Sequence, residues 1–225
     1  GAIAEPGRAL PAQMRALAHS DRLPFRDRGL LIARAAYARN DNERAMTEYR
    51  SLLERYPTDI AVLNNLALVY RDVRRFAEAA ALWNRAIAID SSVNPLYHGL
   101  LNALVGEDKL DSARAIFDIV RRRFPNDGLS PTVAVQLAAA GQEWEEAERL
   151  ARANRERLQG DTLGLVDAYE QLASIVMTRG RLLEAEQLWR TQIMLSTKSE
   201  SYGRRLFGAT QLGLLELRFN RKPVR

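Results

Sequence analysis

Side chains able to do acid–base or metal chemistry are few in this sequence. It holds two histidines, His19 and His98, and no cysteine. A zinc site or a catalytic triad needs further ligands or a base partner at fixed spacing, and neither histidine has them. Cysteine ligands, thiolate nucleophiles and disulfides are excluded, and no glycine-rich phosphate cradle occurs. The sequence therefore predicts no catalytic residue, no metal site, no cofactor and no enzymatic activity.

One cluster of carboxylates is dense enough to suggest acid–base work. It comprises Glu143, Glu145, Glu146 and Glu148. A charge run of this kind along one helix is typical of a solvated face. We therefore interpret the cluster as surface.

Three tryptophans could serve as stacking platforms for nucleic-acid bases: Trp83, Trp144 and Trp189. Trp83 and Trp189 stand in the repeated packing column described below, and Trp144 stands near it. This placement favours a role in the core.

The charge balance also bears on nucleic acid. The formal net charge is +5, and the basic excess gathers after Glu200, with a further run at residues 121–123. Cations at the end of a helix suit its dipole, so we interpret the run as a solvated face rather than a phosphate-binding patch. Binding of nucleic acid through Arg204, Arg205 and Arg218 remains an alternative, which oligonucleotide binding at high salt would test.

The composition predicts a folded segment outside the bilayer. Hydrophobic residues make up 47% of the chain, which is ample for a core. No stretch approaches the roughly 18 consecutive apolar residues of a membrane span, and residues 1–10 have no apolar signal core. We expect a soluble segment of the cytoplasm or periplasm, with no membrane insertion. A start at Gly1 suggests a piece of a longer protein.

The organisation of the chain is set by an internal repeat of 34 residues. Small residues recur at this interval, and a second column, mostly aromatic, follows each of them by four residues. The alanine column is Ala45, Ala79, Ala113 and Ala147, and the second column is Tyr49, Trp83, Phe117 and Ala151. A fifth unit, with Gly180, Ala185 and Trp189, keeps the same offsets after a slip of four residues. Because four residues make about one helical turn, the slip can lengthen a helix without breaking the stack.

Each unit contains two apolar helical patterns around a short polar or glycine-containing break, which predicts a helical hairpin. Asp59, Asn94 before Pro95, and Ser130 before Pro131 are predicted N-caps. A polar cap accepts a free N–H, and a first-turn proline lacks one. A hairpin of this kind buries its apolar face only when neighbours stack on it.

These columns resemble the tetratricopeptide repeat, most clearly in residues 60–93. The signature positions there are Leu66, Ala67, Tyr70, Phe76, Ala79, Trp83 and Ala86. The resemblance implies an all-α, right-handed superhelical solenoid of antiparallel helical hairpins. Five hairpins are expected within residues 24–199, at about 26–59, 60–93, 94–127, 128–161 and 166–199. The 34-residue period and the alanine and aromatic columns favour this family over the RNA-binding pentatricopeptide repeat.

The two ends are expected to differ from the repeats. Residues 1–23 should include a short capping helix at Pro11–Ser20. Residues 200–225 should form a last helix, Ser201–Phe219, which is either a cap or the first half of a truncated sixth repeat. Its expected buried residues are Tyr202, Leu206, Phe207 and Leu214.

The resemblance implies that the first helix of each hairpin lines a concave ligand groove. Asparagine and glutamine side chains both donate and accept hydrogen bonds, as an extended peptide requires. The register places ten polar or aromatic residues on or near this surface: Arg34, Tyr37, Asn64, Asn65, Arg71, His98, Asn102, Gln136, Glu170 and Ser174. At each position, simple surface exposure remains the alternative.

Chaperone-binding members of the family hold a carboxylate tail in a clamp of basic and asparagine side chains. Asn65 fits one position of that clamp. Pro95, Gly99 and Leu30 stand where the family has basic residues. The departure argues against a chaperone tail as the ligand, although Arg34 and Arg71 could still bind an acidic side chain.

The leading hypothesis is a non-enzymatic module that binds a protein or peptide in its groove, with no cofactor. The segment from Leu23 to Asp59 also resembles arrays attached to bacterial serine/threonine kinases and transcriptional regulators, which suggests a larger bacterial signalling protein. The second hypothesis is a scaffold that self-associates through its ends, with a homodimer formed through Phe207 and the last helix.

Overall fold

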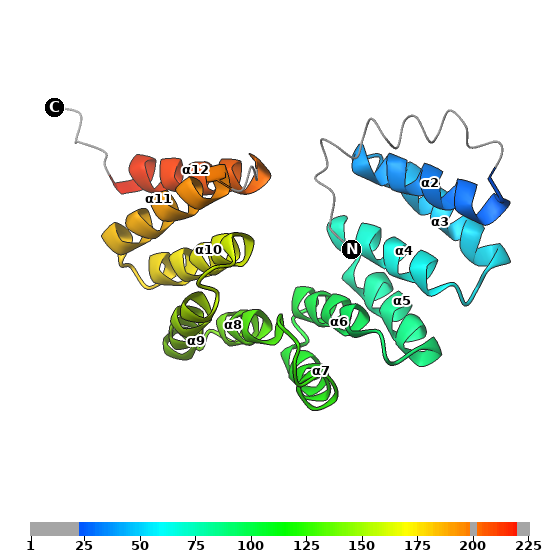
Figure 1. Ribbon diagram of the computed structural model, residues 1–225, viewed down its shortest axis with the longest axis horizontal. Coiled ribbons are helices and arrows are strands. Elements are labelled where there is room, and N and C mark those ends of the chain that lie inside the picture. The colour runs from blue at the N-terminus through cyan, green and yellow to red at the C-terminus, as the bar shows by residue number, and fades with distance from the viewer. Residues whose placement is uncertain (1–22, 199–201, 220–225) are drawn as a thin grey trace. The chain divides into compact units, whose positions relative to one another are not determined.

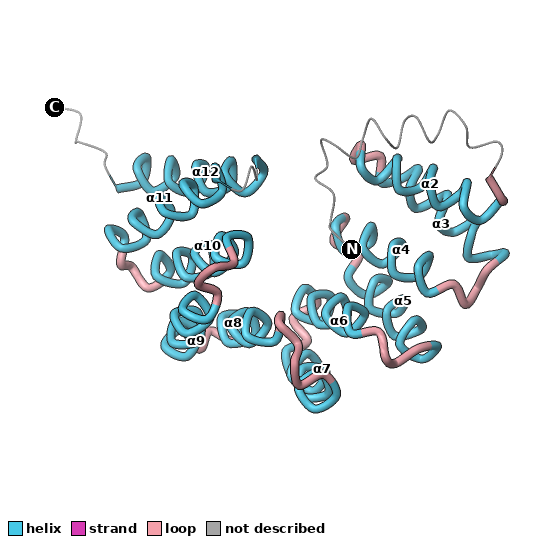
Figure 2. The backbone as a smooth tube through the Cα atoms, in the orientation of Figure 1, coloured by secondary structure: helices cyan, strands magenta, loops and turns pink. Residues whose placement is uncertain are grey.

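The computed structural model describes residues 23–198 and 202–219, and every element in these ranges is an α-helix. The chain divides into two compact units, Gly1–Pro125 and Asn126–Arg225. Within each unit, consecutive helices pack against each other and are joined by short turns, as Figures 1 and 2 show. The predicted all-α fold of helical hairpins is confirmed.

The first unit contains three helical hairpins. Its helices are α2 (Phe25–Ala38), α3 (Asn42–Arg55), α4 (Ile60–Asp72), α5 (Phe76–Ile89), α6 (Asn94–Gly106) and α7 (Leu110–Arg123). The first helices of neighbouring hairpins also meet, since α4 contacts α6.

The second unit contains two hairpins and a final helix. Its helices are α8 (Ser130–Ala140), α9 (Trp144–Arg157), α10 (Thr162–Thr178), α11 (Leu182–Lys198) and α12 (Tyr202–Phe219). Here too the first helices of the two hairpins touch, because α8 contacts α10.

The turn inside each hairpin has a recurrent backbone form. One residue in every such turn has a positive φ, and these residues follow the repeat: Asn40, Arg74, Asp108, Gln142 and Gly180. The first four are 34 residues apart and the fifth follows after 38, so the turns reproduce the slip of the sequence columns. The turn before Trp144 uses Gln142 in this conformation, whereas the neighbouring Gly141 has φ −77°.

The four additional residues lie in α10. This helix has 17 residues, whereas α4 and α6 have 13 each. Asp161 caps its start, because the carboxylate accepts from the backbone N–H of Gly164 at 3.0 Å. The slip therefore lengthens one helix by about a turn and leaves the hairpin intact.

Two of the three predicted N-caps are displaced by one residue. Asp59 caps α4 and accepts from the N–H groups of Ala61 and Val62. Asn94 and Ser130, however, are the first residues of α6 and α8, and neither helix has a side-chain cap. The following prolines lie in the first turn, where a missing N–H costs nothing, and this places the helix start without a polar cap.

The alanine column forms the centre of the packing. Ala45, Ala79, Ala113, Ala147 and Ala185 are all 0% exposed. In the second column Tyr49, Trp83, Ala151 and Trp189 are buried too. Phe117 is only half-buried. Small residues therefore allow close helix contact, and large rings fill the space beside them.

The last helix differs from expectation on its apolar face. Leu206, Phe207 and Leu214 are 55%, 42% and 52% exposed, so their predicted burial is wrong. Among the side chains of α12 that the structure describes, Leu215 is the buried apolar one, while the Phe207 ring packs edge-on against Trp189 with centroids 5.8 Å apart. The side chain of Tyr202, the expected helix at residues 11–20 and the break at residues 220–225 lie outside the described parts.

Candidate functional site

The predicted groove residues divide between the two units. Seven lie in Gly1–Pro125, and Gln136, Glu170 and Ser174 lie in Asn126–Arg225. The two groups differ in how many of their polar atoms already form hydrogen bonds within the protein.

In the first unit, the polar atoms of Tyr37 and Arg71 meet one carboxylate. The Tyr37 hydroxyl on α2 donates to Asp72 on α4. Arg71 donates to the other oxygen of Asp72 at 2.8 and 2.9 Å. Burial and the bond to Asp72 raise the pKa of Tyr37 to about 12. These groups join two neighbouring hairpins, so a ligand would have to compete with existing bonds.

Asn64 and His98 are also part of the packing. The Asn64 side-chain oxygen accepts from the indole N–H of Trp83 at 2.9 Å. His98 is 7% exposed. Both residues therefore contribute to the interior of the first unit.

Three predicted residues of this unit remain at the surface. Arg34 and Asn102 are exposed, and Asn65 is half-buried. Burial raises the pKa of Tyr49 to about 12, although the adjacent Arg34 guanidinium opposes the shift. Arg34 thus lies beside Tyr49.

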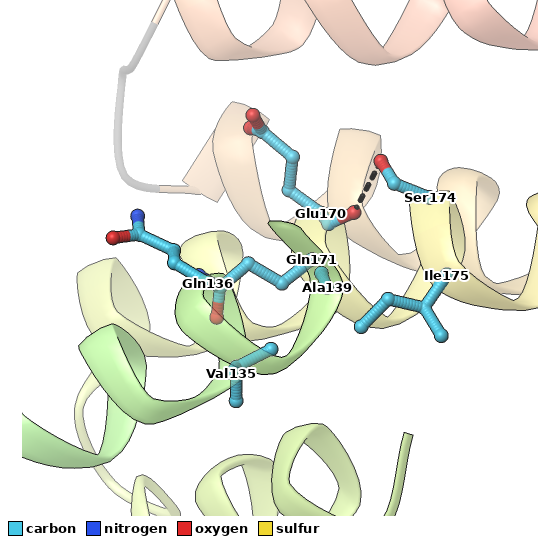
Figure 3. A pocket seen from close by; sticks show the side chains of 7 residues that line it. All are labelled: Val135, Gln136, Ala139, Glu170, Gln171, Ser174 and Ile175. Carbon is cyan, nitrogen blue, oxygen red and sulfur yellow. Dashed lines mark hydrogen bonds between the residues drawn. The ribbon is translucent and has the colours of Figure 1, made fainter. Parts of the chain in front are cut away.

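In the second unit, the structure brings all three predicted residues together. Gln136, Glu170 and Ser174 line one groove of about 220 Å³ between α8 and α10. Four residues that the sequence analysis did not single out complete the lining: Val135, Ala139, Gln171 and Ile175. Figure 3 shows the α8 side chains facing those of α10 across this groove. Contact between the first helices of adjacent hairpins is what creates it.

The groove has an apolar base and a polar rim. Val135 and Ile175 are 1% and 4% exposed, so their accessible edges form the base. The Gln171 amide donates to the backbone oxygen of Thr132 at 3.4 Å and ties α10 to α8. The Gln136 side chain is exposed at the rim, where its amide can both donate and accept.

Glu170 is the charged group of the groove. Its carboxylate is half-buried, and burial raises its pKa above the ordinary value. Among the described residues, no cation or hydrogen-bond donor meets this carboxylate. The hydroxyl of Ser174 donates to the Glu170 backbone oxygen at 2.9 Å instead. The groove therefore carries a negative charge that nothing in the described fold offsets.

The equivalent position in the first unit holds a side chain that is hydrogen-bonded. Glu170 precedes Trp189 by the same 19 residues that separate Asn64 from Trp83. Asn64 accepts from its tryptophan, whereas the Trp189 indole N–H is buried with no partner in the described residues. The same repeat position therefore holds Asn64, which bonds to a buried tryptophan in the first unit, and Glu170, which lines the groove in the second.

A buried ion cluster in the second unit was missed by the sequence analysis. Glu148 is 7% exposed, which makes its assignment to a solvated face wrong. Its carboxylate pairs with three arginines: Arg152 at 2.7 Å, Arg179 at 2.8 Å, and Arg181. These bonds, with Arg181 first, lower the pKa of Glu148 to about 2. Three cations saturate the carboxylate, so it holds α9 to the α10–α11 turn and is not available to a ligand.

Gly99, which the family resemblance aligns with a basic clamp position, has a packing role. It is buried in α6, and a Cβ atom there would lie 2.3 Å from the Cε2 atom of Trp83. A side chain at this position would displace the indole that fills the second column. A basic side chain at residue 99 is therefore incompatible with the indole of Trp83 in this position.

Neither a metal site nor a membrane span is found in the described parts of the chain. In the ranges 23–198 and 202–219, no group of three or more histidine, aspartate or glutamate side chains is arranged to hold a metal ion. No helix described here combines the length and apolar character needed to cross a bilayer.

Comparison with protein-family models gives a match to one part of the chain. Residues 29–59 match the tetratricopeptide-repeat family model. No significant match was found among curated proteins.

Solved structures extend the likeness to most of the chain. A thermophilic tetratricopeptide-repeat protein of Thermus thermophilus aligns with TM-score 0.68 and 19% identity over 83% of this chain and 98% of its own. A tetratricopeptide-repeat protein of Parabacteroides merdae aligns with TM-score 0.63 and 13% identity over 93% and 86%. MamA of Desulfovibrio magneticus aligns with TM-score 0.58 and 9% identity over 80% and 99%. At these identities the likeness concerns the fold. Residues 29–59 therefore match the tetratricopeptide-repeat family model, and the helical hairpins have the fold of solved tetratricopeptide-repeat proteins.

Proposed function

We propose that this chain is a non-enzymatic protein-interaction module that binds an extended peptide, or a loop of a partner domain, in the groove between α8 and α10. The observation that carries the proposal is the groove itself. Three first-helix residues chosen from the register, Gln136, Glu170 and Ser174, line one cavity of about 220 Å³.

The chemistry of the groove suits a peptide. A bound peptide must satisfy backbone N–H and C=O groups while it buries apolar side chains. The exposed amide of Gln136 offers both a donor and acceptors, and Val135 and Ile175 offer an apolar base. Tetratricopeptide repeats generally serve as non-catalytic modules with protein or peptide partners, which agrees with this use. We also propose a larger bacterial regulatory protein as the setting, for which the full reading frame is the test.

Ser174→Trp tests whether the groove binds peptides. The indole would fill much of the cavity without changing the charge, so we expect peptide capture to fall at least tenfold, as loss of about 1.4 kcal/mol implies. The probe is a pool of random heptapeptides with acetylated and amidated ends, captured on immobilised protein and counted by mass spectrometry.

Thr191→Trp provides the matched control. Thr191 is likewise a partly exposed helical residue whose hydroxyl donates to the carbonyl four residues earlier, at 2.9 Å, but it does not line the groove. Its substitution should leave capture unchanged. Equal capture by the wild type and both variants would refute binding in this groove.

Self-association through the last helix is the second candidate, favoured by the leucines exposed on α12. Leu206, Leu214 and Leu217 are 55%, 52% and 68% exposed. Because Phe207 packs on Trp189, Leu217→Glu is a cleaner test than substitution of Phe207. A homodimer should appear in light scattering of the wild type and dissociate in the variant. A wild-type monomer would eliminate this candidate.

A further inference from the structure

The unpaired carboxylate of Glu170 identifies the class of ligand that the α8–α10 groove accepts. The inference rests on the proposed peptide-binding function.

The available polar atoms on the α10 side are acceptors. Glu170 presents an ionised carboxylate, which accepts only. The Ser174 hydroxyl has already given its hydrogen to the Glu170 backbone oxygen, as Figure 3 shows, so toward a ligand it can act only as an acceptor. No lining residue is basic. A ligand therefore gains most from a group that donates several hydrogen bonds and carries positive charge.

The apolar part of the groove suits the rest of such a side chain. Val135, Ala139 and Ile175 form the base, and the Glu170 carboxylate points away from Val135 and Ile175 in Figure 3. Lysine and arginine join a methylene stem to a charged head, and they bury the stem on apolar surface while the head meets a polar partner. We propose that the groove recognises a lysine or arginine of an extended peptide, with its stem on the base and its charged head on Glu170.

The overall charge of the chain does not oppose this recognition. The net charge is +5, but at physiological salt the screening length is about 8 Å, so charges farther than this from the ligand contribute little. Arg204, which stands one repeat of 34 residues after Glu170, pairs with Asp167, and burial is the one cause of the pKa shift of Glu170, with no contribution from a described basic residue. The local charge at the groove is therefore that of Glu170.

The protonation state of Glu170 predicts how binding of the basic residue depends on pH. Burial raises the pKa of the ligand-free carboxylate, and a bound cation would lower it again. Recognition of the basic residue should be complete above the raised pKa and should weaken as the pH falls through it, because the protonated acid carries no charge.

Selection from the random heptapeptide pool tests the proposal with three proteins. In the wild type, peptides captured near neutral pH should be enriched in lysine and arginine. Glu170→Gln keeps the shape but removes the charge, so affinity for a selected basic peptide should drop about tenfold, the amount expected for loss of a hydrogen bond to a charged group. Glu156→Gln makes the same charge change on the exposed surface of α9 and should preserve the enrichment.

The outcomes separate the inference from the proposed function. Capture that is sensitive to Ser174→Trp but not enriched in basic residues would overturn the assignment of the ligand class alone. An enrichment that persists in Glu170→Gln would do the same. Capture by the wild type no greater than by Ser174→Trp would overturn peptide binding in this groove, and the ligand class with it. Because Glu170 is an unpaired, half-buried charge, its neutral variant should fold at least as stably, which thermal unfolding can check.

Discussion

At the residue scale, one glycine and one tryptophan show how packing limits recognition. Gly99 lies against the Trp83 indole, which is 0% exposed and donates to Asn64. The ring is thus fixed both by contact and by a hydrogen bond, and cannot move aside for a side chain. A basic clamp residue is incompatible with this arrangement, whatever the exposed residues nearby could bind.

Gly99→Ala should destabilise the first unit. Alanine is favoured over glycine in a helix by about 1 kcal/mol. The new Cβ atom would lie 2.3 Å from a fixed ring, and overpacking of this kind costs about 1–3 kcal/mol, so the steric term should win. Gly213→Ala on α12 is the matched control, because a Cβ atom there meets nothing within 4 Å and the helix should gain stability. Urea unfolding of both variants provides the measurement, and a stabilised Gly99→Ala would show that the indole relocates.

At the element scale, the turn between paired helices is the most regular feature. Each turn places one residue at positive φ, and four of the five do so without glycine. Asn40 and Asp108 tolerate this conformation through short polar side chains, whereas Arg74 and Gln142 adopt it less readily. The turn geometry is therefore imposed by the packing of the two helices rather than by the turn residue.

Gly180→Ala should cost about 1 kcal/mol of folding free energy. Its φ is +79°, where an L side chain is disfavoured by about 1–2 kcal/mol, partly offset by the smaller entropy of the unfolded alanine chain. Gly128→Ala is the control, because Gly128 lies in a loop of the same unit, without positive φ and with open space around its Cα. A thermal midpoint that falls for Gly180→Ala but not for Gly128→Ala is expected. Equal midpoints would mean that the turn relaxes to another form.

At the scale of the whole molecule, the chain consists of two units with separate cores. One core lies among α2–α6, with Ile116 of α7 against it, and the other among α8–α12. In a repeat protein each element is stabilised mainly by its neighbours, so a local defect should affect one unit first. The Glu148 cluster allows this to be tested, because its partners all lie in the second unit.

Glu148→Gln should weaken the second unit alone. The pKa of Glu148 falls from 4.5 to about 2 on folding. The stabilisation is therefore complete above pH 4.5 and lost as the pH falls toward about 2. Near neutral pH the variant should lose about 2 kcal/mol, as for a hydrogen bond to a charged group, and the difference should shrink in acid.

Hydrogen exchange locates that effect. Amides of α9–α11 should exchange faster in Glu148→Gln, whereas those of α4–α6 should keep their protection. The control is Glu186→Gln, which removes an exposed pair with Arg190 at 2.8 Å and should change stability by less than about 1 kcal/mol. Equal loss of protection in both units would mean that the described chain unfolds as one cooperative body.

Much of the architecture was determined by the sequence alone, because helix packing repeats the same side-chain sizes at a fixed interval. The alanine column, the rings four residues later and the slip of four residues predicted the hairpins and their turns. Three of the predicted groove residues, those of the second unit, line one cavity. The turn residues at positive φ are also visible in the sequence, as four polar residues spaced 34 apart. A polar residue in a turn can have either sign of φ, however, so the sequence did not predict this backbone conformation.

The tertiary structure decided which polar side chains remain free. Asn64 and Glu170 occupy the same place in the repeat, yet one bonds to its tryptophan and the other does not. In the sequence Glu148 resembles its exposed neighbours, but in the structure it is surrounded by three arginines from α9 and the α10–α11 turn. Periodicity determines which helix face a residue occupies, whereas hydrogen bonds and ion pairs depend on the partner that another element brings within about 3 Å. The helical array could therefore be predicted from residue spacing, while the acceptor-rich groove at Glu170 emerged only when α8 and α10 were placed side by side.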